Sequence, residues 1–327
     1  MNKGLIENKW YIVLDSDELK RGKTTKIKFF GNDIILWRDS NNNVNAVDSR
    51  CPHRGANLAL GEVVDDNIQC PYHGFLFNGK GEAVLIPSQG KKSTINSSYK
   101  TKSYKVRDYE NFIFLWYGDD SITQIKWFDN LDNSFSTSTM KVMWNTNYTR
   151  AIENQLDVSH LPFVHRTTIG RGGRTLVNGP IAELNGDVLD VWVCNESDNG
   201  QQPKKQDEMR KDDCSGRLQF IFPNYWQNII SDKLRIVAAF VPVDDTSTTL
   251  YIRIYQKILN VFLLKSIFNY ITMRFNGVVL KQDEGVVTSQ TPKISDIYNK
   301  ELLVQADAPI ILFRKYMHEN SGRMEIQ

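Results

Sequence analysis

Two short segments that each combine a cysteine with a histidine constrain this chain more than any other feature. They read CPHRG, starting at Cys51, and CPYHG, starting at Cys70. The 327-residue chain has only 4 cysteines and 5 histidines, so these two segments hold half of the thiols. Thiol and imidazole side chains that are scarce elsewhere and gathered in pairs indicate metal binding.

The spacing of the four side chains separates two kinds of metal site. In a structural zinc site of Cys2His2 type, one segment usually supplies two cysteines and the other supplies two histidines. Here each segment supplies one of each, Cys51 with His53 and Cys70 with His73. That mixture suits a Rieske [2Fe–2S] centre, in which one iron binds both cysteines and the other binds both histidines. We expect a Rieske cluster and keep a zinc site as the alternative.

A second group of potential metal ligands reads NQLDVSHLPFVH, from Asn154 to His165. The pattern predicts a helix from about residue 147 to His160, on which Asn154, Asp157 and His160 share a face. Pro162 would end this helix and let His165 turn back towards His160. Two imidazoles and a carboxylate from elsewhere would form a 2-His-1-carboxylate iron site with open positions for O2. Taken alone, two histidines near a helix end are more often structural.

The carboxylate must come from later in the chain. The segment LKQDEGVVTSQ follows a run of amphipathic helical character and contains Asp283 and Glu284. From the residues alone either could be the ligand, and a solvated acidic pair is the ordinary alternative.

The pattern of strands and helices predicts two domains of an α+β protein. Residues 1–118 contain many short strands with close turns, as in a small barrel or sandwich. Residues 119–145 are polar and read as a connection. Strands return between residues 189 and 255, and two helices are expected at about 258–290 and 307–319. We therefore expect a Rieske domain over 1–118 and a mononuclear iron domain over 119–327.

Charge and hydropathy exclude several classes of protein. The chain carries 40 basic and 38 acidic side chains, a formal net charge of +2, which argues against a general nucleic-acid or membrane-surface binder. The N-terminus has no apolar core of signal-peptide type, and no stretch reaches the roughly 20 apolar residues of a membrane span. The expectation is a soluble, cytoplasmic protein.

Together, these motifs resemble the catalytic subunit of the Rieske non-haem iron oxygenases, with the same order along the chain. The chain is most similar to the short homotrimeric class, such as vanillate O-demethylase, dicamba monooxygenase and the saxitoxin-pathway hydroxylases. The resemblance implies an N-terminal all-β Rieske domain. It also implies a helix-grip, START-like catalytic domain with a curved antiparallel sheet around a long helix.

The resemblance further implies a role for each motif residue. The [2Fe–2S] cluster would be bound by Cys51, His53, Cys70 and His73. The mononuclear Fe(II) would be bound by His160, His165 and Asp283, with Glu284 as second choice. Asp157 would bridge a Rieske histidine of a neighbouring subunit, expected to be His73, to His160, and Asn154 would lie near the iron.

The implied activity is monooxygenation of a small molecule with O2, by C–H hydroxylation or oxidative demethylation. No G-x-G-x-x-G fingerprint is present, so a separate reductase or ferredoxin would supply electrons. Residues 91–107 carry six basic and no acidic side chains; they either steer an acidic donor or form a lysine-protected edge strand. The competing hypotheses are a Rieske electron carrier and a zinc-stabilised module that binds a small ligand.

Three smaller expectations concern the second half of the chain. Cys194 and Cys214 belong to no motif and are expected to be ordinary thiols. Residues 195–215 are nearly devoid of apolar side chains and are expected to form a surface loop, with a lid as the alternative. Several aromatic or apolar residues could line a substrate pocket, although simple core positions are the commoner outcome: these are Phe220, Phe222, Tyr225, Trp226, Phe240 and Met273.

Overall fold

The computed structural model describes residues 4–129, 131–132, 134–258 and 262–321. It divides the chain into two compact units. One unit comprises Asn8–Thr123, and the other joins residues 4–7 to the chain from Gln124 onward. The first unit contains strands and short 3-10 turns, whereas the second combines a large sheet with helices, so the predicted α+β class is confirmed. The expected boundary of the functional domains at residue 118 stays a prediction.

The unit 8–123 is built from short antiparallel strands. They form three sheets, in the orders β1-β10-β9, β2-β3-β4 and β5-β6-β7-β8. The bounds are β1 Lys9–Asp15, β2 Thr24–Phe29, β3 Asn32–Arg38, β4 Val44–Asp48, β5 Glu62–Val64, β6 Asn67–Gln69, β7 Leu76–Phe77, β8 Ala83–Leu85, β9 Val106–Tyr109 and β10 Phe112–Tyr117. The basic segment 91–107 is mostly irregular, and only its end belongs to the edge strand β9, so the alternative of an edge strand along the whole segment was wrong.

The apolar core of this unit contains both cysteines of the paired motifs. Cys51 and Cys70 are each 2% exposed, and they belong to one cluster of buried side chains with Trp37, Phe75 and Phe77. A thiol buried among apolar groups is not available to solvent, so any ligand of these sulfurs must be enclosed by the fold.

The second unit contains a seven-stranded antiparallel sheet in the order β11-β17-β16-β15-β14-β13-β12. The bounds are β11 Ser136–Trp144, β12 Leu176–Asn185, β13 Val188–Glu196, β14 Gly216–Ile221, β15 Tyr225–Ser231, β16 Leu234–Asp244 and β17 Ser247–Gln256. Residues 136–144 form a strand rather than part of the expected polar connection, so that prediction was wrong. Exposed and less exposed residues alternate along β11, because one face of this edge strand is turned to solvent.

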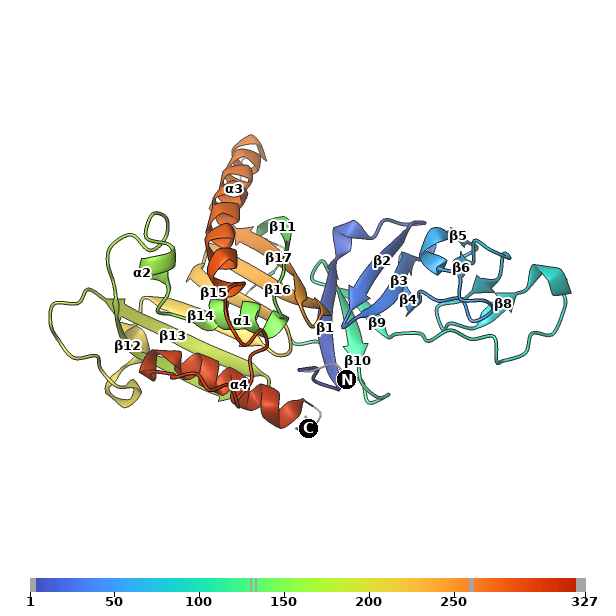
Figure 1. Ribbon diagram of the computed structural model, residues 1–327. Coiled ribbons are helices and arrows are strands. Elements are labelled where there is room, and N and C mark those ends of the chain that lie inside the picture. The colour runs from blue at the N-terminus through green and yellow to red at the C-terminus, as the bar shows by residue number, and fades with distance from the viewer. Residues whose placement is uncertain (1–3, 130, 133, 259–261, 322–327) are drawn as a thin grey trace. The chain divides into compact units, whose positions relative to one another are not determined.

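Among the described residues, four α-helices accompany this sheet: α1 Tyr148–Leu156, α2 Leu161–Val164, α3 Phe262–Val287 and α4 Ala308–Asn320. Figure 1 shows α1 and α4 lying against the sheet and α3 as a long helix that ends beside α1. α1 packs on β16 and β17, α4 packs on β12 and β13, and α1 contacts both α3 and α4. The two late helices were predicted close to their observed bounds. No helix in the described ranges combines the length and apolarity of a membrane span.

The two cysteines of this unit are joined in a disulfide, so the expectation of ordinary thiols was wrong. Cys194 lies on β13 and Cys214 lies just before β14, and their Cα atoms are 4.4 Å apart. β13 and β14 are hydrogen-bonded neighbours, which brings the two side chains together although 20 residues separate them in sequence. The disulfide closes the base of the polar loop that the sequence predicted.

Candidate metal centre and its cavity

The segment that carries the two central histidines folds differently from the predicted continuous helix. Asn147 caps the N-terminus of α1, because its side chain accepts a hydrogen bond from the Thr149 N–H, and the helix ends at Leu156. Asp157 follows as the C-terminal cap, and His160 and His165 flank the short helix α2. Pro162 was expected to end the first helix, but that helix ends earlier. Pro162 lies in the first turn of α2, where its missing N–H costs no hydrogen bond.

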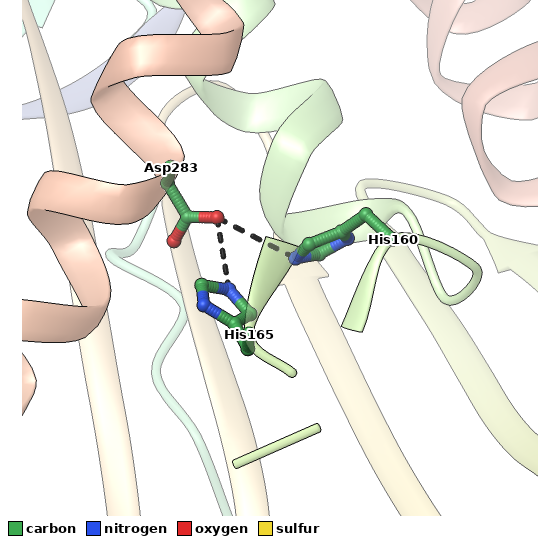
Figure 2. Close-up of side chains that lie close together, drawn as sticks. All are labelled: His160, His165 and Asp283. Atoms are coloured by element: carbon green, nitrogen blue, oxygen red, sulfur yellow. Dashed lines mark ion pairs between the residues drawn. The ribbon is translucent and has the colours of Figure 1, made fainter. Parts of the chain in front are cut away.

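This arrangement brings two imidazoles and one carboxylate together, as Figure 2 shows. Oδ1 of Asp283, on α3, lies 3.0 Å from Nε2 of His165 and 3.6 Å from Nε2 of His160. One ligand atom from each of the three residues lies within 4.8 Å of the others. His165 and Asp283 are almost fully buried, and His160 is partly exposed. The three side chains have the composition of a 2-His-1-carboxylate iron site.

The neighbouring Glu284 is not part of this group. Asp283 is one of the residues that line the adjoining cavity, together with both histidines, and it is 2% exposed. Successive residues of a helix point about 100° apart, so only one of the two acidic side chains can face the histidines. The helix therefore turns Asp283 towards the histidines; Asp283 is the ligand that the resemblance implied, with Glu284 as the second choice.

Both histidines are contacted at their second ring nitrogen. Nδ1 of His165 lies 2.9 Å from Oε1 of Gln282. Nδ1 of His160 lies 3.5 Å from Oδ2 of Asp157, a contact too long to count as a formed hydrogen bond. Gln282 was not among the predicted site residues; its position next to a candidate acidic ligand was the only signal for it in the sequence.

Asn154 and Asp157 are held at the edge of the same group. Nδ2 of Asn154 donates a hydrogen bond to Oδ1 of Asp283 at 3.2 Å, and its oxygen accepts one from Gln155. Oδ1 of Asp157 accepts hydrogen bonds from the backbone N–H and the hydroxyl of Ser159. Burial raises the pKa of Asp157, but His160 and Ser159 outweigh it and the net shift is downward. Asp157 is therefore held as a carboxylate.

The donor set fits a divalent metal ion. Burial lowers the pKa of His165, but hydrogen bonds to Asp283 and Gln282 outweigh this effect and raise the pKa overall. The contact between Nε2 and the carboxylate thus favours a positive charge between them. A metal cation bound at this point would supply that charge in place of a proton.

A cavity of about 610 Å³ opens beside the three residues. Alternate residues of three adjacent strands line it on one side: Val193 and Asn195 of β13, Gly216 and Leu218 of β14, and Trp226 and Asn228 of β15. Of the six residues proposed as pocket lining, only Trp226 lies here. Phe222, for example, stacks on Tyr316 in the core, as the alternative anticipated. The indole Nε1 of Trp226 and Oδ1 of Asn195 are buried without a hydrogen-bond partner.

The polar loop borders the cavity only at its two ends. Ser197 and Ser215 belong to the lining, whereas the middle of the loop is bonded to β12: the Lys204 N–H donates to Oδ1 of Asn178 at 2.8 Å. The loop is therefore anchored at its centre as well as by the disulfide at its base.

In the unit 8–123, the two cysteine–histidine segments form turns of the same geometry. The N–H of Cys51 donates to the carbonyl of Ala56, and that of Gly55 donates to the carbonyl of Cys51. The same bonds recur from Cys70 to Phe75 and from Gly74 to Cys70. Gly55 and Gly74 have φ of 72° and 71°, a region that favours glycine. The two loops are therefore equivalent although their Cys-to-His spacings differ.

The side chains of these turns suit a two-iron cluster. His53 and His73 lie with ring centroids 4.7 Å apart at the exposed end of the loops, while both thiols are buried. Burial and the neighbouring Cys70 raise the pKa of Cys51 to about 11, so its thiolate requires a positive charge nearby, which iron would supply. Partial desolvation, with His53 and Arg54, lowers the pKa of His73 and favours the neutral imidazole that a metal needs.

A buried charge network supports the helix that precedes the histidines. Glu153 of α1 binds Arg150 at 2.8 Å and Arg314 of α4 at 2.6 Å. Both arginines also bind Glu301. Arg150, Glu153 and Arg314 are at most 4% exposed, so the network joins α1 to α4 and to the segment before α4 through mostly buried charges.

This network predicts a loss of stability in acid. Burial raises the pKa of Glu301, but its hydrogen bonds and ion pairs with the two arginines outweigh burial and lower it below 4.5. Its stabilising contribution is therefore complete above pH 4.5 and is lost as the pH falls through the folded-state pKa. The expected result is that Glu301→Gln lowers the unfolding midpoint in denaturant near pH 7 and that this difference shrinks below pH 4. A constant difference across that range would contradict it.

Two protein families match the chain, one for each half. Residues 9–108 match the Rieske [2Fe-2S] domain, and residues 144–321 match the vanillate O-demethylase oxygenase C-terminal domain. These matches favour the predicted Rieske cluster over the zinc site that was kept as the alternative.

Among curated proteins, the chain is 33% identical over 176 residues to cholesterol 7-desaturase nvd of Hemicentrotus pulcherrimus; the match covers 51% of this chain and 37% of that protein. It is 31% identical over 171 residues to the toluene-4-sulfonate monooxygenase system iron-sulfur subunit TsaM1 of Comamonas testosteroni, covering 50% and 48%. It is 24% identical over 257 residues to a 3-chlorobenzoate-3,4-dioxygenase oxygenase subunit of the same organism, covering 76% and 58%. The first of these matches spans little more than a third of the relative's length, and the second about half.

Solved structures share the fold over nearly the whole chain. NdmA of Pseudomonas putida CBB5 has a TM-score of 0.77 at 22% identity, with coverage of 95% of this chain and 89% of that one. Dicamba monooxygenase bound to 3,6-dichlorosalicylic acid has a TM-score of 0.78 at 17% identity, with coverage of 96% and 97%. At these identities the likeness concerns the fold.

Proposed function

We propose, on the premise that this chain belongs to the Rieske non-haem iron oxygenases, that it monooxygenates a small organic molecule with O2. Membership brings a Rieske [2Fe–2S] cluster and a mononuclear non-haem iron. The observation that carries the proposal is that His160, His165 and Asp283 converge beside a cavity of about 610 Å³. A volume of roughly 300–1,000 Å³ is typical of sites for small molecules.

The proposed reaction is C–H hydroxylation or oxidative demethylation. In hydroxylation, a C–H bond, O2, two electrons and two protons give an alcohol and water. If the carbon is an O- or N-methyl group, the same balance ends in formaldehyde and the demethylated product. When bound, the mononuclear iron supplies the O2 chemistry and the cluster delivers electrons singly, from a separate reductase or ferredoxin.

The residues of the cavity would bind and orient the substrate. Apolar side chains such as Val193 and Leu218 form an apolar wall of the cavity on the side of the sheet. Trp226 and Asn195 add polar side chains to this wall, and each has one buried polar atom without a hydrogen-bond partner. Such atoms cost free energy while they stay unpaired, so a rearrangement that pairs them with substrate would favour binding.

Asp157 is proposed to carry electron transfer between subunits of a homotrimer. One of its oxygens is held by Ser159, while the other faces Nδ1 of His160. Its side chain remains 26% exposed, so a second imidazole N–H can approach it. His73 of a neighbouring copy, exposed beside its cluster, is the proposed partner. A carboxylate that accepts from both rings would connect the cluster of one chain to the iron of another.

Asp157→Ala is expected to block this connection without removing either metal. The expected result is reoxidation of the chemically reduced cluster by O2 that is at least about 10- to 100-fold slower, the usual cost of losing a hydrogen-bonded partner of a ligand. Stopped-flow absorption of the cluster measures it, and iron analysis verifies that both sites remain loaded. The exposed Asp212→Ala serves as the matched control. An unchanged reoxidation rate in Asp157→Ala would exclude this route.

The reaction class is tested with ¹⁸O2. The purified chain, a surrogate ferredoxin and its reductase are offered a panel of small methoxy-, N-methyl- and alkyl-aromatic compounds, and products are identified by mass spectrometry. One labelled oxygen atom in the product supports monooxygenation. One formaldehyde for each molecule of demethylated product supports it equally. Two labelled atoms in one product would instead establish dioxygenation.

The remaining alternative is a Rieske electron carrier. It predicts that His160→Ala leaves every function intact, whereas the oxygenase proposal predicts loss of substrate oxidation with an unchanged cluster spectrum. A cytoplasmic location stays part of the proposal and is tested by fractionation of the native cells.

A further inference from the structure

We infer that Gln282 is a positioning residue for the mononuclear metal, because it holds the His165 imidazole in the tautomer whose Nε2 can bind a cation. The inference rests on the proposed function in one respect, namely that His165 is a metal ligand. It goes beyond that function by assigning the group that orients this ligand.

The contacts of the imidazole determine its tautomer. Nδ1 of His165 lies 2.9 Å from Oε1 of Gln282. An amide oxygen only accepts hydrogen bonds, so Nδ1 must carry the proton and donate it. In the neutral ring Nε2 then keeps its lone pair, and this atom lies 3.0 Å from Oδ1 of Asp283. The nitrogen that faces the metal position is therefore the one that can bind metal.

The amide is itself held in one orientation. The hydroxyl of Thr168 donates to Oε1 of Gln282 at 3.0 Å, and Nε2 of Gln282 donates to the hydroxyl of Thr167 at 3.3 Å. A flipped amide would place its NH2 group against Nδ1 and lose the acceptor there. The backbone N–H of Thr168 donates to the carbonyl of His165 at 2.8 Å. His165, Thr168 and Gln282 are therefore connected in a closed cycle of hydrogen bonds.

Consecutive residues of α3 thus contact the two nitrogens of one imidazole. Gln282 contacts Nδ1, and Asp283 contacts Nε2. The ring of His165 is 1% exposed and has little freedom to rotate. The other imidazole differs, because Nδ1 of His160 faces the carboxylate of Asp157. One histidine therefore has a neutral orienting partner and the other a charged one, and their ligand strengths should differ.

The experiment compares Gln282→Leu with Gln282→Glu. The full chain is used with its cluster intact and oxidised and with the mononuclear metal removed by chelation, and Co(II) is the probe. Leucine removes the acceptor, so Co(II) should bind about 10- to 100-fold more weakly, with an altered high-spin Co(II) EPR spectrum. Glutamate keeps an acceptor for Nδ1–H and should restore binding close to the wild type. A purely structural role would not be rescued by a charged side chain.

Two controls separate the possible failures. The exposed Gln206→Leu makes the same change away from the site and should bind Co(II) normally. His165→Ala should abolish binding; normal binding in that variant would overturn the metal site and this inference together. If His165→Ala loses Co(II) while Gln282→Leu matches the wild type in affinity and EPR spectrum, only the role of Gln282 is overturned.

A second variant tests the inference if Gln282→Leu does not fold. If circular dichroism shows that Gln282→Leu has lost the native fold, Thr168→Val replaces it, because this change removes one of the hydrogen bonds that orient the amide. Weaker Co(II) binding and an altered EPR spectrum in that variant support the inference, and wild-type values overturn it.

Discussion

Alanine in place of Asp283 is expected to remove the mononuclear iron and abolish turnover while the Rieske cluster remains. The carboxylate is buried, and its Oδ1 is the atom that approaches both histidine nitrogens. Without it, two neutral imidazoles would have to hold a divalent cation alone. Iron should fall from about three to about two atoms per chain. The loss of activity should exceed the 10- to 100-fold that is typical of losing an orienting partner.

The adjacent Glu284→Ala provides the control for this prediction. It removes a carboxylate from the same turn of α3, yet Glu284 does not line the cavity. Iron content and turnover should therefore stay near the wild type. The opposite pattern, with iron lost in Glu284→Ala and kept in Asp283→Ala, would reverse the assignment of the acidic ligand. Iron analysis with visible spectra of both variants distinguishes the two results.

Alanine in place of Glu153 is expected to destabilise the second unit by about 3–5 kcal/mol, the usual cost of removing one partner from a buried ion pair. The carboxylate accepts from Arg150, from Arg314 and from the hydroxyl of Ser295. Its removal leaves two buried guanidinium groups with less compensation. Glu301 retains contacts with both arginines, which keeps the loss from being larger.

Denaturant unfolding, followed by tryptophan fluorescence, measures this loss. The exposed Glu319→Ala on α4 makes the same change without buried partners and should alter stability by less than about 0.5 kcal/mol. A Glu153→Ala variant as stable as Glu319→Ala would show that the network contributes little. Because Asn154 follows Glu153 on α1, we also expect the variant to bind its mononuclear metal less well.

The motifs that sequence analysis recognised are those whose geometry is local. Each cysteine–histidine turn closes by hydrogen bonds within five residues, so its spacing already contains its shape. His160 and His165 are similarly close, and the proline between them indicated a change of direction. Even here the details differed: α1 stops at Leu156, and Asp157 caps it, because the carboxylate bonds the N–H of Ser159 and competes with helical hydrogen bonding.

Other features depended on contacts between distant segments. Asp283 lies 123 residues beyond His160 in this numbering, and only the rotation of α3 against α2 selects it over Glu284. The Cys194–Cys214 disulfide follows from the pairing of β13 with β14, and Gln282 acquires its role from the imidazole it meets. Strand β11 escaped notice because one face of an edge strand is solvated and reads as polar.

The sequence by itself determined the kind of chemistry, since scarce ligand types at short spacings leave few alternatives for a chain. Only the tertiary structure decided which carboxylate faces the histidines, which side chains orient them and which residues form the cavity. The physical reason is that these properties depend on how helices and strands far apart in sequence are rotated against one another. Packing of the whole domain sets those rotations, and no short segment encodes them.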